Sequence, residues 1–370
     1  MGRLTRAKMQ QHTRARVLAA AWEEFAHRGF RNARIDAIAE RAALTRGAVY
    51  SNFPGKRALY FAVLADLVEH APPPPHPAPG RTAREALGAF ARAWIAGFSL
   101  ADGEGYGMAR LVSDLLSEIV ADEQVRRPFG QLMKLDALML ALALEQLHPP
   151  ARSSGEPPRR LVRLAETVLT TLYGAGQVTA AAPGLVEPFD VVSACEQLAE
   201  LSLDDWWSPP PTAPQPQPTD EPWAPPAVPD LVRGEPALLT GDGVVAVLGL
   251  HRLTAVEEAV RAAPAESRVT AVLVTSDPEE LAPLARLTLA GPCGCLRQAF
   301  PRAAWPRLQV VCDELGVLAA AAGVPAVSDI TETAVRIEAG RIVARAEGRG
   351  ACHAVASGSP TPVSATGRSG

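Results

Sequence analysis

The sequence predicts a multi-domain protein, in which an all-α N-terminal region is followed by a smaller α/β domain. Three observations support this prediction. Apolar residues recur at helical spacing through most of residues 13–203. Beyond residue 230, short valine-rich runs alternate with helical patterns. Two proline-rich stretches, 71–80 and 208–230, separate the parts, and a length of 370 residues suits two or three domains.

Residues 34–56 predict two short helices joined by a tight turn. Apolar residues recur at helical spacing in the first helix, about 34–41. Thr45 is a good N-cap for the second, about 46–51, because its hydroxyl can accept a hydrogen bond from a backbone N–H of the first turn. Pro54 ends that helix. Two helices across such a turn form the unit that places a recognition helix in the DNA major groove.

A longer helix precedes this pair. Thr13 is a candidate N-cap, Val17 and Phe25 lie on the apolar stripe, and Gly29 ends the helix as a C′ glycine. Together the three helices predict a helix-turn-helix head over residues 1–70.

The charge is distributed unevenly. Residues 1–60 hold 12 Lys/Arg and 4 Asp/Glu, a net charge of +8, although the whole chain has a net charge of −4. A basic head on an acidic body indicates nucleic-acid binding by the head. A merely solvated basic surface is the alternative, and the helix pair argues against it.

These residues resemble the tetracycline-repressor (TetR) family of bacterial regulators. The resemblance runs from TRARVLAAAWEEFAHRGF (13–30) through IDAIAERAALTRGAVYSNFPGK (35–56) to about residue 64. It implies a dimeric sensor that binds operator DNA and releases it when a small molecule binds. The chain departs from the family pattern in two places. Ala43 stands where the turn usually has glycine, which costs stability if this residue has a positive φ. Ala33 and Arg34 stand where a Thr or Ser cap is usual.

The predicted DNA-binding residues lie on the second helix and beside it. Arg46 is the candidate for base readout, since a guanidinium can bond O6 and N7 of guanine together, and Gly47 allows close approach of the backbone. The remaining residues suit phosphate contacts, which set the register on the duplex; Tyr50 could instead pack on the head. The full set is Arg34, Thr45, Arg46, Gly47, Tyr50, Ser51, Asn52 and Lys56.

The body is predicted to follow a semi-rigid proline-rich spacer at 71–80. Residues 81–207 have a helical pattern throughout, and the family resemblance implies an effector-binding and dimerisation domain. The predicted helices lie near 82–100, 105–121, 124–147, 159–178 and 188–203.

Two sets of body residues are candidates for binding. Apolar stripes on the last two helices favour a dimer interface, with packing inside one chain as the alternative: Leu161, Leu164, Val168, Leu172, Val191, Cys195 and Leu198. Bulky residues on the middle helices are either plain core or the lining of an effector pocket: Trp94, Phe98, Met108, Leu111, Phe129, Met133 and Tyr173. Asp114 and Glu118 lie one helical turn apart. They could hold a cation together, or they could simply belong to a solvated face.

The tail is predicted to begin with an extended linker, since residues 208–230 include ten prolines. An α/β domain follows over 231–349. VVAVLGL (244–250) and VTAVLVTS (269–276) predict buried strands, with helical patterns beside them and two closing strands near the end. Residues 350–370 are predicted to be disordered.

The second half of the tail, from LAAAAGVPAV to RIVARAEG, resembles the swivelling phosphohistidine domain of phosphoenolpyruvate-utilising enzymes. Between His251 and His353 the chain has no histidine, so the phosphoryl carrier of that domain is missing. Cys293 and Cys295 form a C-x-C pair, which suits either buried thiols or a soft-metal or redox site. No metal site is predicted.

The function predicted is a DNA-binding transcriptional regulator, a repressor relieved by a small-molecule effector, acting as a homodimer on a palindromic operator. The alternative gives the α/β domain a role as an additional sensor, partner-binding module or enzyme. No nucleophile–base pair or phosphate loop stands out, so no catalytic residue or cofactor is expected. Without an apolar run of about 18 residues, a signal sequence or a disulfide framework, the protein is expected to be cytoplasmic.

Overall fold

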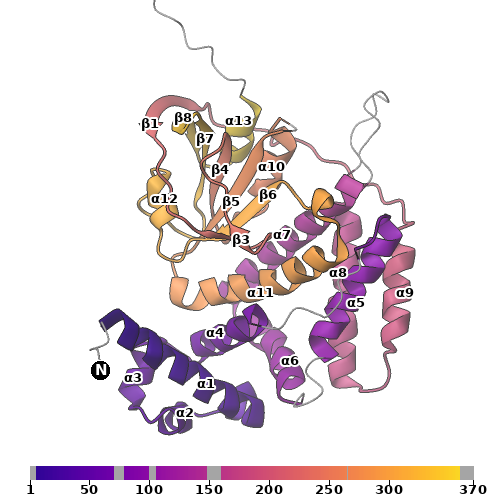
Figure 1. Cartoon of the computed structure of the whole chain (residues 1–370), viewed down its shortest axis with the longest axis vertical. Helices are drawn as coiled ribbons and strands as arrows, with labels where there is room; N and C mark the ends of the chain where they lie inside the picture. Colours follow the sequence, from indigo (N-terminus) through magenta and orange to yellow (C-terminus); the bar gives the residue numbers. More distant parts are fainter. Residues whose placement is uncertain (1–5, 71–78, 100–105, 148–159, 265, 359–370) are drawn as a thin grey trace, which may run out of the picture.

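The computed structural model describes residues 6–70, 79–99, 106–147, 160–264 and 266–358, with the side chains of 6–7, 98–99 and 106–113 excepted. Within these ranges the chain forms a helical N-terminal half and a C-terminal half built on a mixed sheet (Figure 1).

The head consists of α1 (Arg6–Asn32), α2 (Ile35–Arg41), α3 (Arg46–Tyr50) and the following α4 (Lys56–Glu69). Its centre is aromatic: the Tyr60 ring lies 5.3 Å from Phe25 and 4.8 Å from Phe30 between ring centroids. The prediction for Gly29 is confirmed, since the helical backbone breaks there at φ 72°. The prediction for Thr13 is wrong. It lies inside α1 and its hydroxyl donates to the Met9 carbonyl, 3.0 Å away.

The body contains α5 (Ala83–Ser99), α6 (Tyr106–Ala121), α7 (Glu123–Leu147), α8 (Val162–Ala181) and α9 (Pro188–Leu198), close to the predicted ranges. Helix α7 packs against α8 and α6, while α9 packs against α5 and α8. The predicted break after α7 falls on residues 148–159, and the spacer largely on 71–78; both lie outside the described part.

The C-terminal domain contains a six-stranded sheet of order β1-β8-β7-β4-β5-β6. Its strands are β1 (Gln217–Pro222), β4 (Gly243–Gly249), β5 (Arg268–Val274), β6 (Leu308–Cys312), β7 (Glu332–Glu338) and β8 (Arg341–Glu347). Strands β4, β5 and β6 are parallel, and the other pairs are antiparallel. Parallel neighbours need crossovers, which α10 (Ala255–Ala262) and α11 (Pro278–Ala299) provide. A short ribbon pairs β2 (Pro229–Asp230) with β3 (Glu235–Pro236).

Alternate residues of the central strands bury two different faces. Val244, Ala246 and Leu248 of β4 belong to the large core that includes α10 and α11, whereas Val245 and Val247 belong to a second cluster with α12 (Val317–Ala321). The strands predicted at 244–250 and 269–276 are therefore confirmed as buried on both faces, as central parallel strands usually are.

Two predictions about the edges of this domain are wrong. Residues 217–222 of the predicted linker form strand β1, paired with β8, and Trp223 is buried with its indole N–H donating to the Leu239 carbonyl at 2.7 Å. The predicted disordered tail begins with helix α13 (Ala351–Ser357), in which Cys352 and Val355 are fully buried. Prolines fit at β1 because it is an edge strand.

Helix α11 joins the two halves of the molecule. It packs on α4, α5 and α7 (Figure 1), and its apolar residues continue the core of the helical half. Among the described residues, none of the helices combines the length and apolar character that crossing a membrane requires.

Replacing Trp223 tests whether the proline-rich segment is part of the folded domain. Trp223→Ala should lower the unfolding free energy of the C-terminal domain by about 3–5 kcal/mol, as expected for a buried tryptophan. Hydrogen exchange of the β7 and β8 amides measures this domain directly. Trp206→Ala is the matched control, because Trp206 is 77% exposed. Equal effects of the two substitutions would contradict the packing of this segment.

Candidate nucleic-acid interface

Helix α3 is a short exposed helix whose start is fixed locally. Thr45 has an extended backbone, and its side-chain oxygen accepts a hydrogen bond from the Ala48 N–H at 3.2 Å. The predicted N-cap is thereby confirmed. Val49 is buried against the head, so the opposite face of α3 is turned to solvent.

Arg46 lies on that outward face with 61% of its side chain exposed. Its guanidinium lies 3.5 Å from the Asp36 carboxylate of α2 and 5.5 Å from the centre of the Tyr50 ring. A hydrogen bond with Tyr50 and the Asp36 charge raise the pKa of Arg46, so the group stays cationic. These neighbours orient the guanidinium without covering it.

The other predicted residues divide into exposed and engaged side chains. Arg34, Gly47 and Tyr50 are exposed, and a Cβ placed at Gly47 would meet only the Thr45 hydroxyl at 3.9 Å. Near the end of α3, the Ser51 hydroxyl and Asn52 amide donate to the Ala48 carbonyl at 3.0 and 2.8 Å.

Lys56 is engaged within the head. Its ammonium donates to the Arg31 carbonyl at 3.1 Å and lies 4.7 Å from the centre of the Phe30 ring. Partial burial lowers the pKa of Lys56. The side chain thus ties the start of α4 to the end of α1, and a phosphate contact by Lys56 remains a prediction.

The turn between α2 and α3 has the strain that the sequence suggested. Ala43 has φ 49°, a left-handed conformation that favours glycine. At the start of α2, the N-cap residue Arg34 makes no side-chain cap bond. Instead, its backbone N–H donates to the fully buried carboxylate of Glu24, 3.4 Å away. Glu24 thus satisfies the N–H of the N-cap residue, as the acidic residue of a capping box does.

Three contacts outside the predicted set connect the head to the rest of the chain. The Phe30 N–H, at the end of α1, donates to the Asp114 carboxylate of α6 at 2.8 Å, so Asp114 is a structural acceptor. Arg57 at the start of α4 contacts Asp122 at 2.7 Å and Glu280 of α11 at 2.5 Å. We call this trio the Arg57 clasp. Nothing local in the sequence pairs residues 57 and 280, which lie over two hundred positions apart.

A second ion pair between α4 and α11 lies farther along α4. Arg286 of α11 lies 3.4 Å from Glu69 of α4 and 3.2 Å from Glu314. The C-terminal domain therefore holds two points of the helix that links head to body.

The candidate effector residues are only partly brought together. The Trp94 and Tyr173 rings meet edge to face at 4.8 Å, and burial raises the pKa of the Tyr173 hydroxyl. Phe129 and Met133 are half-buried on α7. The side chains of Phe98, Met108 and Leu111 lie outside the described part. An effector pocket here remains a prediction.

Five of the seven predicted dimer residues are covered within the single chain. Leu164, Val168, Leu172, Val191 and Cys195 are buried within the single chain, and Leu161 and Leu198 pack against the same core. A side chain buried in its own chain has no surface left for a partner, so the alternative of intrachain packing holds for those five. Leu161 and Leu198 are half-buried, and their place in a dimer interface stays a prediction. The exposed apolar residues of this region are Val178, Leu185 and Phe189.

The C-x-C pair lies inside the α11 interface. Cys293 and Cys295 are buried, and burial raises the pKa of the Cys295 thiol to about 12. The Cys293 thiol lies 4.0 Å from the Met139 sulfur. Among the described residues, no group of three or more His, Cys, Asp or Glu side chains is placed to hold a metal ion.

The head matches a known family. Residues 17–63 match the sequence profile of "Bacterial regulatory proteins, tetR family". Over 65 residues the chain is 46% identical to the HTH-type transcriptional regulator SrpR of Pseudomonas putida and 46% identical to the uncharacterized HTH-type transcriptional regulator TtgW of the same species. These matches cover 18% of this chain, and 30% and 48% of the two relatives. The chain thus spans less than half of the length of either.

Solved structures of transcriptional regulators are similar to about half of this chain. They include FadR of Bacillus subtilis in complex with stearoyl-CoA (15% identity, TM-score 0.34) and NalD of Pseudomonas aeruginosa, the secondary repressor of the MexAB-OprM multidrug efflux pump (20% identity, TM-score 0.34). The matches cover 50% and 53% of this chain and 96% and 99% of those chains.

Relieving the strain in the turn should stabilise the head. Ala43→Gly should raise its unfolding free energy by about 0.5–1 kcal/mol, the left-handed penalty of about 1–2 kcal/mol less the greater entropy loss of glycine. Ala37→Gly, inside α2, is the control and should lower it by about 1 kcal/mol. Hydrogen exchange of α1 and α4 amides measures both. A loss of stability in Ala43→Gly would show that the turn favours alanine.

Proposed function

We propose that this chain is a transcriptional regulator that binds operator DNA through α2 and α3, because residues 17–63 match the tetR family of bacterial regulatory proteins. The observation that carries the proposal is the outward face of α3. A threonine cap fixes the start of the helix, Val49 anchors it, and Arg46 projects from it with most of its surface free. A helix presented in this way suits insertion of its N-terminal residues into the major groove.

The side chains of the interface suit distinct roles. Arg46 is the base reader, since its planar guanidinium matches the acceptor pair of guanine. Thr45, Tyr50 and Arg34 are exposed and serve as phosphate contacts that set the register on the duplex. The net charge of +8 on residues 1–60 supplies the attraction that is independent of base sequence.

A homodimer follows from the geometry of such readers. Two heads that bind one face of a palindrome must reach half-sites about 34–36 Å apart, or a multiple of that distance. We assign the pairing surface to the outer faces of α8 and α9 and the turn between them, where Val178, Phe189 and Leu185 are exposed. Phe189, with 77% of its surface exposed, is the natural anchor of a self-complementary contact.

Repression relieved by a small molecule requires a route from the body to the head. The contacts at Asp114 and the Arg57 clasp provide two such routes, through α6 and through α4. A bound effector that shifts either helix would change the separation of the two heads and so favour the free state. The C-terminal domain takes part because α11 forms one side of the clasp.

Removing the base reader tests the proposal. Arg46→Ala should cost about 1–3 kcal/mol of operator binding and relax specificity at one base pair. Footprinting upstream of the chain's own and neighbouring genes finds the operator, and a gel shift on it gives the affinity. Arg92→Ala, an exposed arginine of α5, is the control. Equal operator affinity in both variants would remove Arg46 from the interface.

Breaking the clasp tests the role of α11. Glu280→Gln should weaken operator binding by about 0.5–2 kcal/mol, because a looser α4 lets the heads sample separations that do not fit the operator. Glu235→Gln is the control, since Glu235 pairs with Arg302 in the same domain at 2.7 Å and neither residue is on α11. An unchanged affinity in Glu280→Gln would show that α11 only packs against α4.

A further inference from the structure

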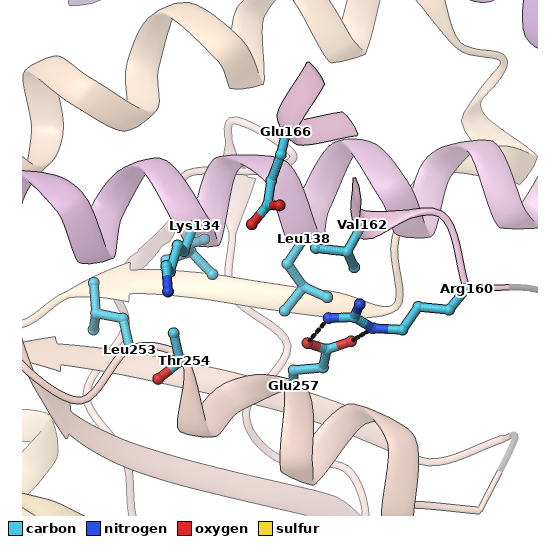
Figure 2. Close-up of a pocket in the computed structure, with 9 residues that line it drawn as sticks. Lys134, Leu138, Arg160, Val162, Glu166, Leu253, Thr254 and Glu257 are labelled. Atoms are coloured by element: carbon cyan, nitrogen blue, oxygen red, sulfur yellow. Dashed lines mark hydrogen bonds and ion pairs between the residues drawn. The ribbon is translucent and has the colours of Figure 1, made fainter. Parts of the chain in front are cut away.

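A small cavity lies at the seam between the helical body and the C-terminal domain. It has a volume of about 110 Å³ and is lined from α7, from α8 with the segment before it, and from residues 253–257 at the start of α10 (Figure 2). It is far along the chain from the predicted DNA-binding residues and separate from the candidate effector residues.

The floor of the cavity is apolar. Leu138 of α7, Val162 of α8 and Leu253 before α10 are all buried and line it together. A ligand that fits here therefore presents a small apolar group to this floor, since burying apolar surface is favourable. The volume is small, so the apolar group that lies on this floor is a short one.

The charged residues that line the cavity are of two kinds, paired and unpaired. Arg160 and Glu257 pair with each other through two hydrogen bonds of 2.7 and 2.8 Å, so they neutralise one another. Lys134 and Glu166 are different: both line the cavity, and neither forms an ion pair or side-chain hydrogen bond with another described residue. Figure 2 shows the Glu166 carboxylate pointing toward the space between Lys134 and Leu138.

We propose that this cavity binds a small apolar α-amino acid as its zwitterion. Lys134 pairs with the carboxylate, assisted by the Thr254 hydroxyl, which makes no cap bond to α10. Glu166 pairs with the ammonium group, and the side chain lies on the floor of Leu138, Val162 and Leu253. Lys134, Glu166 and Thr254 are exposed at the mouth of the cavity, so a zwitterion can pair with both charged side chains without bringing a net charge to the site.

A ligand with only one charged group fits less well. A simple carboxylate would satisfy Lys134 and lie near the like charge of Glu166, while a simple amine would satisfy Glu166 and lie near Lys134. Each arrangement leaves one charge without a partner and adds a repulsion. The zwitterion is therefore the ligand class that matches both walls together.

The location of the site makes it a sensor, a role that depends on the regulator function proposed above. Body and C-terminal domain are already joined around it by Thr254, whose N–H donates to Gln131 at 3.2 Å, and by Arg261, which pairs with Glu145 at 2.6 Å. A ligand that bridges α7 and α8 to α10 strengthens this seam, and α11 of the same domain contacts α4. Occupancy would thus reach the head through the Arg57 clasp.

Calorimetry with the full-length chain, free of DNA, tests the binding directly. Alanine and 2-aminobutyric acid are titrated beside propionate and ethylamine, which each lack one of the two charged groups of alanine. The amino acids should bind, and each single-charge analogue should bind at least about tenfold more weakly, a difference of about 1.4 kcal/mol. The substitutions Lys134→Met and Glu166→Gln should each weaken the binding of both amino acids by about the same tenfold factor.

The control variant is Glu187→Gln, an exposed carboxylate outside the cavity, and its affinity should equal that of the unchanged protein. The proposal would be overturned if neither amino acid gave a heat of binding up to millimolar concentration. It would also be overturned if propionate and alanine bound with equal affinity. Gel shifts with the same variants separate the two questions. A chain that binds alanine but no DNA refutes the regulator function alone, and one that binds DNA but no amino acid refutes this site alone.

Discussion

The burial of helix α4 on all sides is the constraint on which the arrangement depends. Eight consecutive residues, 58–65, are buried, which a helix achieves only when it has packing partners all round. The head supplies one side through α1, and α11 of the C-terminal domain supplies another. Because both ends of the chain pack on this one helix, neither the head nor the C-terminal domain can move without disturbing its contacts.

The head was predictable because its signals are local. The cap at Thr45, the break at Gly29 and the positive φ at Ala43 depend on residues within a few positions of one another, and the structure shows all three. Lys56 shows the limit of this reasoning. A lysine at the start of α4 looks available for a phosphate, but its contact with the Arg31 carbonyl depends on where the end of α1 lies, which spacing along the chain does not reveal.

The C-terminal domain was predictable at its centre and not at its edges. Strands β4 and β5 are continuous valine-rich runs, whereas β1 contains Pro218 and Pro222 and exists only because β8 pairs with it across more than a hundred residues. Composition alone predicts an extended linker. The extended backbone is confirmed, but the segment is part of the sheet and not a free linker. The predicted dimer residues show a related limit, since periodicity finds the apolar face of α8 and α9 without saying whether this chain or another covers it.

Regulation through α11 requires a place where its packing can change at a low cost in free energy. Asp136 of α7 lies at such a place. This side chain is 1% exposed, its two oxygens have no hydrogen-bond partner among the described residues, and burial raises its pKa well above the usual range. A neutral but unsatisfied carboxyl group costs stability where it is buried. Met139, one turn along α7 from Asp136, lies 4.0 Å from Cys293 of α11 between sulfur atoms, so the cost falls where α7 packs on α11. The lower packing stability of this seam reduces the free energy that a ligand must supply to change how α11 lies on α7.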